Sequence, residues 1–201
     1  MTPRSIPLKP TVCLILSGPS WLEVDADRLQ QADATFIAVN DTGPLLPWTD
    51  YWFTVDSNQV RINGPVVTQK RIVGARLSNP PKHADYWIPT TSWTDKWDAD
   101  TLRGYNTGMA AHEMCLKHPA VERVFLFGCD LRLDWQAWHD VSVRRPQAHH
   151  KAYGAPLIGY WSSLPLVPAS FVVAPESRLT RFPRISWAEA EARLLDDPTR
   201  P

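Results

Sequence analysis

The sequence has no excess of charge of either sign. Its 201 residues include 21 Lys and Arg against 21 Asp and Glu, so the formal net charge is zero. This balance gives no electrostatic footprint for duplex DNA or an anionic membrane, although a local basic patch can exist within a neutral total. The neutral net charge therefore neither favours nor excludes a nucleic acid as a partner. No apolar run is long enough for a signal peptide or a membrane span, which predicts a cytoplasmic protein.

Cysteine is scarce, and several familiar motifs are missing. The three cysteines, Cys13, Cys115 and Cys129, form no CxxC pair, so no zinc site or disulfide framework is indicated. Their apolar surroundings predict buried free thiols in a reducing compartment. The sequence also lacks GxGxxG, the P-loop GxxxxGK[ST], HExxH and GxSxG. It therefore gives no motif support for an NAD site, a Walker-type ATP site, a zinc protease or a serine hydrolase.

Short, continuously apolar runs alternate with amphipathic segments along the chain. Continuous apolar character is typical of strands covered on both faces of a sheet. The pattern predicts an α/β fold, a Rossmann-like three-layer sandwich with a mainly parallel sheet. We expect a single domain over residues 1–201, with a core of about 11–195 and short tails. The predicted strands are 11–16, 35–39, 51–55, 71–75, 123–127 and 170–174, and the predicted helices are 21–31, 106–118 and 186–195.

Small, polar or acidic residues follow four of these predicted strands. Ser17-Gly18-Pro19-Ser20 follows the first strand, Asn40 the second, Asp56 the third and Asp130 the strand 123–127. In open parallel sheets, ligands bind beyond the carboxyl ends of the strands. These residues are therefore candidates for a ligand site.

Two segments could hold an anion at the start of a helix. In the Ser17–Ser20 turn, glycine permits a close backbone approach, proline can begin a helix, and free N–H groups attract phosphate. An ordinary tight turn with Ser20 as the helix cap is the alternative interpretation. Asn106-Thr107-Gly108 opens the predicted helix 106–118, either as an anion site or as a capping turn. The two roles are compatible.

Carboxylates and histidines supply the candidate chemical groups. Asp56 and Asp130 could bind a divalent cation through oxygen, or they could be ordinary solvated acids. His149 and His150 lie in the polar, basic segment RRPQAHHKAY. Histidine titrates near neutral pH and is a natural general acid or base, although a single histidine is more often structural.

The order of several segments resembles a known family. The segments are LILSGPSW, IAVND, DYWFTVD, YNTGMAAHEMCL, VERVFLFGCDLRLD and FVVAPESRLTRFPRIS. Together they resemble the small bacterial CMP-sialic-acid-dependent sialyltransferases. They also resemble the related motility-accessory-factor and hydroxymethylpterin-pyrophosphokinase-like proteins, a group with phage and prophage members. The resemblance covers about residues 11–190, and Leu16 stands where the motif GxGPS has its first glycine.

The resemblance implies a nucleotide-dependent transferase, specifically a metal-independent, glycosyltransferase-like enzyme. Its substrates would be a CMP-type nucleotide-sugar donor and an unknown acceptor, with no permanently bound cofactor. His149 or His150 would act as the catalytic general base. Together with the residues at the strand ends, the candidate nucleotide-binding set is Ser17, Gly18, Pro19, Ser20, Asn40, Asp56, Asn106, Thr107, Gly108 and Asp130.

Two alternatives remain open at this point. The first is pyrophosphoryl transfer from ATP, with a magnesium ion near Asp56 and Asp130. The second is a phage-type nucleotide-binding protein that keeps the fold without catalysis. A sugar transferase acting on DNA is compatible with the same fold but gains no support from the neutral charge. A homo-oligomer is also compatible with the sequence.

Overall fold

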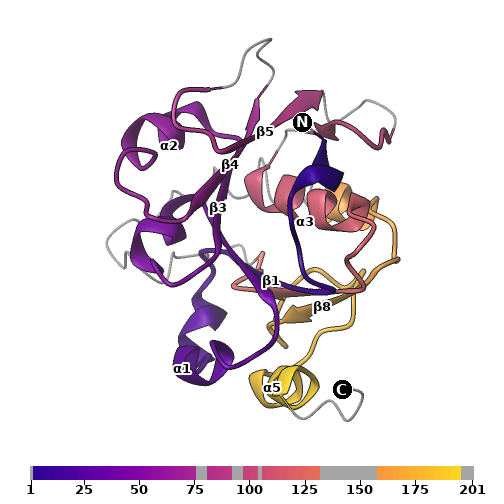
Figure 1. Ribbon diagram of the computed structural model, residues 1–201. Helices are drawn as coiled ribbons and strands as arrows, with labels where there is room; N and C mark the ends of the chain where they lie inside the picture. Colours follow the sequence, from indigo (N-terminus) through magenta and orange to yellow (C-terminus); the bar gives the residue numbers. More distant parts are fainter. Residues whose placement is uncertain (1, 76–80, 92–96, 104–105, 132–157, 196–201) are drawn as a thin grey trace, which may run out of the picture.

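One parallel sheet organises the chain. The computed structural model describes residues 2–75, 81–91, 97–103, 106–131 and 158–195 (Figure 1). Eight strands within them form a single sheet in the order β6-β5-β4-β3-β2-β1-β7-β8, and every pairing is parallel. The predicted α/β, Rossmann-like single domain is confirmed. The strands are β1 (Thr11–Ile15), β2 (Thr35–Val39), β3 (Tyr51–Thr54), β4 (Lys70–Ala75), β5 (Tyr86–Thr91), β6 (Leu102–Arg103), β7 (Arg123–Phe127) and β8 (Ala169–Val173).

Helices cover both faces of this sheet. They are α1 (Ala26–Leu29), α2 (Ser57–Ile62), α3 (Thr107–Lys117) and α5 (Trp187–Leu195), with 3₁₀ helices η1 (Pro3–Ser5), η2 (Pro19–Glu23) and η3 (Asn40–Leu45). Because successive strand residues point to opposite faces, Val12 and Leu14 of β1 join the cluster around α3, whereas Cys13 and Ile15 join the opposite cluster. Figure 1 shows α3 on one side of the sheet and α1 and α5 on the other.

The direction of chain travel across the sheet reverses at β1. From β1 the chain proceeds strand by strand to β6, and then returns through α3 to β7 on the other side of β1. Trp21 and Leu29, in the connection from β1 to β2, pack in the cluster on one face of the sheet, whereas Trp161, in the connection from β7 to β8, packs in the cluster on the other face. Such a topological switch point is where open α/β sheets bind ligands.

The six predicted strands are present, with ends that differ by at most one residue, but two strands and some helices were not predicted. β5 contains Pro89, and β6 has only two residues, so neither gives a long apolar run. The single helix predicted over 21–31 is wrong, because the chain forms η2 and then α1. Asp25 separates them: its side chain accepts hydrogen bonds from the N–H groups of Asp27 and Arg28 and begins a new helix.

Local capping agrees with the sequence elsewhere. Ser186 and Glu189 form the predicted capping box before α5, with Ser186 N–H donating to Glu189 Oε2 at 2.8 Å and Glu189 N–H donating to Ser186 Oγ at 3.2 Å. The three cysteines are buried and free, as expected. No helix in the described parts of the chain has the length and apolar character needed to cross a membrane.

Candidate functional site

The loops that follow β1 and β7 are bonded directly to each other. The N–H of Gly18 donates to the carbonyl oxygen of Gly128 at 2.9 Å. The hydroxyl and the N–H of Ser20 both donate to Oδ2 of Asp130, at 2.9 and 3.3 Å. Asp130 is only 4% exposed, so its carboxylate helps to join the two loops. Ser20 lies inside η2 and bonds to Asp130, rather than capping a helix as in the ordinary-turn interpretation.

The glycine of the Ser17–Ser20 turn is required by the neighbouring loop. A Cβ atom on Gly18 would lie 2.0 Å from Oδ2 of Asp130 and 2.3 Å from the carbonyl oxygen of Gly128. Gly128 itself has a φ of 64°, a conformation that other residues rarely adopt. Pro19 begins η2, in agreement with the prediction that it starts a helix.

The N-terminus of α3 lies beside the end of β1. A Cβ on Gly108 would lie 2.4 Å from Cδ2 of Leu16 and 3.3 Å from Cζ2 of Trp161. Leu16, which precedes the Ser17–Ser20 turn, thus fills the space next to Gly108. Of the two candidate caps, Asn106 and Thr107, it is Asn106 that caps the helix, with its Oδ1 accepting from the N–H of Met109 at 3.1 Å.

Two backbone donors remain at this helix start. Among the described residues, none accepts a hydrogen bond from the N–H groups of Thr107 or Gly108. The first N–H groups of a helix carry partial positive charge and attract anions. The arrangement can therefore bind a phosphate or carboxylate, in addition to its capping role.

The loop after β2 is hydrogen-bonded to the end of β1. The hydroxyl of Thr42 donates to the carbonyl oxygen of Ile15, the last residue of β1, at 3.1 Å. Asn40 is half-buried and has a φ of 55°, which asparagine tolerates better than most residues. We call residues 16–20, 40, 106–108 and 128–130 the switch-point edge.

Asp56 stands apart from Asp130. Asp56 is exposed and caps α2, its Oδ1 accepting from the N–H of Asn58 at 2.8 Å. β2 and β1 lie between β3 and β7, and at about 4.8 Å per strand the two strands are about 14 Å apart. One ion with bonds of about 2.1 Å does not reach both carboxylates. No group of three or more potential metal-binding side chains occurs within the described ranges.

The proposed general bases, His149 and His150, lie outside the described residues. The three histidines that are described do not belong to the switch-point edge. His83 precedes β5, and His118 follows α3 and bonds to the carbonyl oxygen of Ile6 at 2.7 Å. His112 is fully buried inside α3, and this burial lowers its pKa to about 3, so it is neutral near pH 7.

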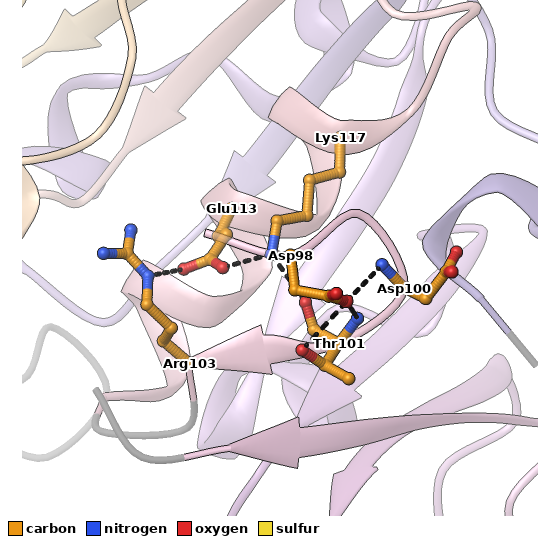
Figure 2. A network of polar contacts seen from close by, with 6 residues as sticks. All are labelled: Asp98, Asp100, Thr101, Arg103, Glu113 and Lys117. Atoms are coloured by element: carbon orange, nitrogen blue, oxygen red, sulfur yellow. Dashed lines mark hydrogen bonds and ion pairs between the residues drawn. The ribbon is translucent and has the colours of Figure 1, made fainter. Parts of the chain in front are cut away.

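Sequence reasoning did not identify a buried ionic network on α3. The carboxylate of Glu113 is completely buried and accepts from Nε of Arg103 at 2.9 Å and from Nζ of Lys117 (Figure 2). Lys117 also donates to the carbonyl oxygen of Thr101 at 2.5 Å, and its Nζ lies 4.4 Å from the ring centroid of Trp97. Burial lowers the pKa of Lys117, while Glu113 opposes that shift. The i,i+4 spacing of Glu113 and Lys117 was the available signal, but it is equally typical of an exposed helix face.

His112 was also not singled out. Its Nε2 lies 2.8 Å from Oγ of Ser170, and its ring packs against Trp161 and Phe182 with centroids 5.5 and 5.1 Å away. Its Nδ1 is buried and has no hydrogen-bond partner among the described residues. Every residue of α3 is buried, so the usual one-sided apolar pattern is absent and polar core residues cannot be recognised by their period.

A scan against protein-family models found no match to this chain, and searches of curated proteins and of solved structures found none either.

Proposed function

We propose that the protein is a nucleotide-dependent transferase that binds its donor at the switch-point edge. The observation that carries this proposal is the direct contact of three segments far apart in sequence. Gly18 bonds to Gly128, and Gly108 packs on Leu16 at the end of β1. These contacts put backbone donors at a topological switch point, where parallel α/β sheets bind nucleotides.

The charge distribution at this edge suits a phosphate group. The N–H groups of Thr107 and Gly108 begin α3 and have no acceptor among the described residues. The carboxylate of Asp130, which would repel a phosphate, is buried and accepts two hydrogen bonds from Ser20. A nucleotide phosphate near the start of α3 would thus accept hydrogen bonds from these N–H groups, while the carboxylate of Asp130 is held by Ser20.

The proposed reaction is glycosyl transfer from a CMP-type sugar donor to an acceptor hydroxyl. His149 or His150 would take the proton of that hydroxyl, and the acceptor oxygen would bond to the anomeric carbon. The bond from that carbon to the phosphate oxygen breaks, and CMP leaves with its electron pair. Support for the donor type and for the base comes from the motif order and the basic segment around the histidines. A single magnesium ion shared by Asp56 and Asp130 is not favoured, because they follow strands separated by two others.

A thermal-shift panel tests the proposal. The protein would be melted with CMP, CDP, CTP, UDP, GDP, ADP and ATP, each with and without magnesium. A ligand at 100 times its Kd stabilises the folded state by about 2.7 kcal/mol, which raises the Tm of a domain this size by about 5–11 °C. We expect such a shift with cytidine nucleotides and no magnesium requirement. A shift with ATP alone that needs magnesium, or no shift with any nucleotide, would contradict the proposal.

A further inference from the structure

Two side chains on one face of β3 hold Asn40 in a fixed orientation. Trp52 and Thr54 are two residues apart and therefore point to the same side of the sheet. Nε1 of Trp52 donates to the backbone carbonyl of Asn40 at 2.7 Å. The hydroxyl of Thr54 donates to the side-chain Oδ1 of Asn40 at 2.8 Å. Both the backbone and the amide of Asn40 are thus fastened to β3.

The hydroxyl group of Thr54 both accepts and donates a hydrogen bond. The Thr54 side chain is completely buried, and its Oγ1 accepts from the N–H of Asp56 at 3.0 Å. Its single hydroxyl proton then needs an acceptor, since an unpaired buried donor is costly. Among the described residues, Oδ1 of Asn40 is the acceptor that this hydroxyl has. The oxygen of the amide is therefore engaged within the protein.

The nitrogen of the same amide is left for a ligand. No described residue accepts a hydrogen bond from Nδ2 of Asn40, and the residue is half-buried at the switch-point edge. The amide nitrogen of an asparagine carries two N–H donors. Nδ2 of Asn40 can therefore donate to a ligand oxygen or nitrogen that carries a lone pair.

We infer that Thr54 is a positioning residue that fixes Asn40 as a hydrogen-bond donor to the nucleoside part of the ligand. The partner of Nδ2 is an acceptor atom, either a ribose hydroxyl oxygen or a carbonyl oxygen or ring nitrogen of the base. This inference rests on the proposed nucleotide site. It adds the orientation of Asn40 and the residue that imposes it.

Four variants separate this role from a structural one. N40D replaces both donors with a carboxylate that repels acceptor atoms, T54V removes the hydroxyl, and T54S retains it. T49V is the matched control, because Thr49 is also buried and donates to the carbonyl of Leu46, outside the switch-point edge. Isothermal titration with CMP would be measured for each variant, with Tm as the check on folding.

We expect N40D to weaken CMP binding by at least about tenfold and T54V by a few-fold, as lost hydrogen bonds predict. T54S and T49V should bind CMP as the wild type does, although T49V should lose stability. With 2′-deoxy-CMP and 3′-deoxy-CMP, a vanishing effect of N40D assigns the acceptor to the ribose, and a persisting effect assigns it to the base. Wild-type affinity in N40D, or equal affinities of T54V and T54S, would overturn the inference.

The free protein provides a test that does not depend on nucleotide binding. A carbonyl carbon resonates downfield when its oxygen accepts a hydrogen bond, so ¹³C NMR of the Asn40 side-chain carbonyl reports on the bond from Thr54. We expect an upfield change in T54V and none in T54S or T49V. If the wild type binds no nucleotide, the proposed function fails while this result still decides the orientation of Asn40. An unchanged carbonyl shift in T54V would overturn the orientation itself.

Discussion

Replacing Glu113 with glutamine should destabilise the protein far more than an ordinary ion-pair mutation. The Glu113 side chain is completely buried, and those of its partners Lys117 and Arg103 are 1% and 12% exposed. E113Q leaves two nearly buried cations without their shared anion. Removing one partner of a buried ion pair costs about 3–5 kcal/mol. At about 2–4 °C per kcal/mol for a domain of this size, E113Q should lower Tm by about 6–20 °C.

An exposed ion pair in the same protein supplies the control for this prediction. Glu191 on α5 accepts from Nε of Arg28 at 2.8 Å, and their side chains are 28% and 48% exposed. Exposed pairs contribute about 0–1 kcal/mol, so E191Q should unfold in urea close to the wild-type midpoint. Equal urea midpoints for E113Q and E191Q would refute the reasoning.

A triple variant tests whether the cost comes from unpaired charge. Substituting Arg103→Met, Glu113→Leu and Lys117→Met replaces the network with apolar side chains of comparable length. Such replacements of buried ionic groups are often neutral or stabilising. We expect the triple variant to be more stable than E113Q in the same urea experiment. A triple variant as unstable as E113Q would show that unpaired charge is not the cause.

Three further predictions concern other parts of the molecule. Burial lowers the pKa of His112 from 6.5 to about 3, so only the unfolded chain takes up a proton between these values. The free energy of unfolding should therefore fall by about 1.4 kcal/mol per pH unit as pH decreases through this window. Urea unfolding measured from pH 7 to 4.5 should show that this free energy depends less steeply on pH in H112Q than in the wild type. G18A places a Cβ 2.0 Å from a carboxylate oxygen and should destabilise by about 1–3 kcal/mol. In G159A no atom of the described residues lies within 4 Å of the added Cβ, so this variant should keep or raise Tm. H149A or H150A should reduce turnover of a CMP-sugar by about 10²–10⁴-fold with CMP affinity unchanged. A variant that loses turnover and CMP affinity to the same extent would contradict a general-base role.

The location of the candidate site could be predicted because the ends of the strands can be recognised in the sequence. Ser17–Ser20, Asn40, Asp56 and Asp130 each follow an apolar run, and in a parallel sheet those ends share one edge. Which of them meet could not be predicted, because that depends on strand order. β7 lies beside β1, so Asp130 bonds to Ser20 across 110 residues of sequence. Asp56 follows β3, two strands farther away.

The interior of α3 could not be predicted for a different physical reason. A helix with one solvent face reveals its core residues through their period, but α3 is buried on all sides. Glu113 and His112 therefore look like surface residues in the sequence. The burial of Glu113 depends on its pairing with Arg103 of β6, and that of His112 depends on Ser170, 58 residues away in the sequence. The hydroxyl of Thr54, likewise, can be assigned to Asn40 only once β2 and β3 are paired.

A ¹H–¹⁵N correlation spectrum titrated with CMP tests most directly whether the switch-point edge is the nucleotide site. We predict that the largest shifts fall on the backbone N–H groups of 17, 18, 20, 106–108 and 128–130 and on the side-chain NH₂ of Asn40. CMP that leaves these signals unchanged, or that shifts only residues at the opposite edge of the sheet such as His118, would contradict the proposed site.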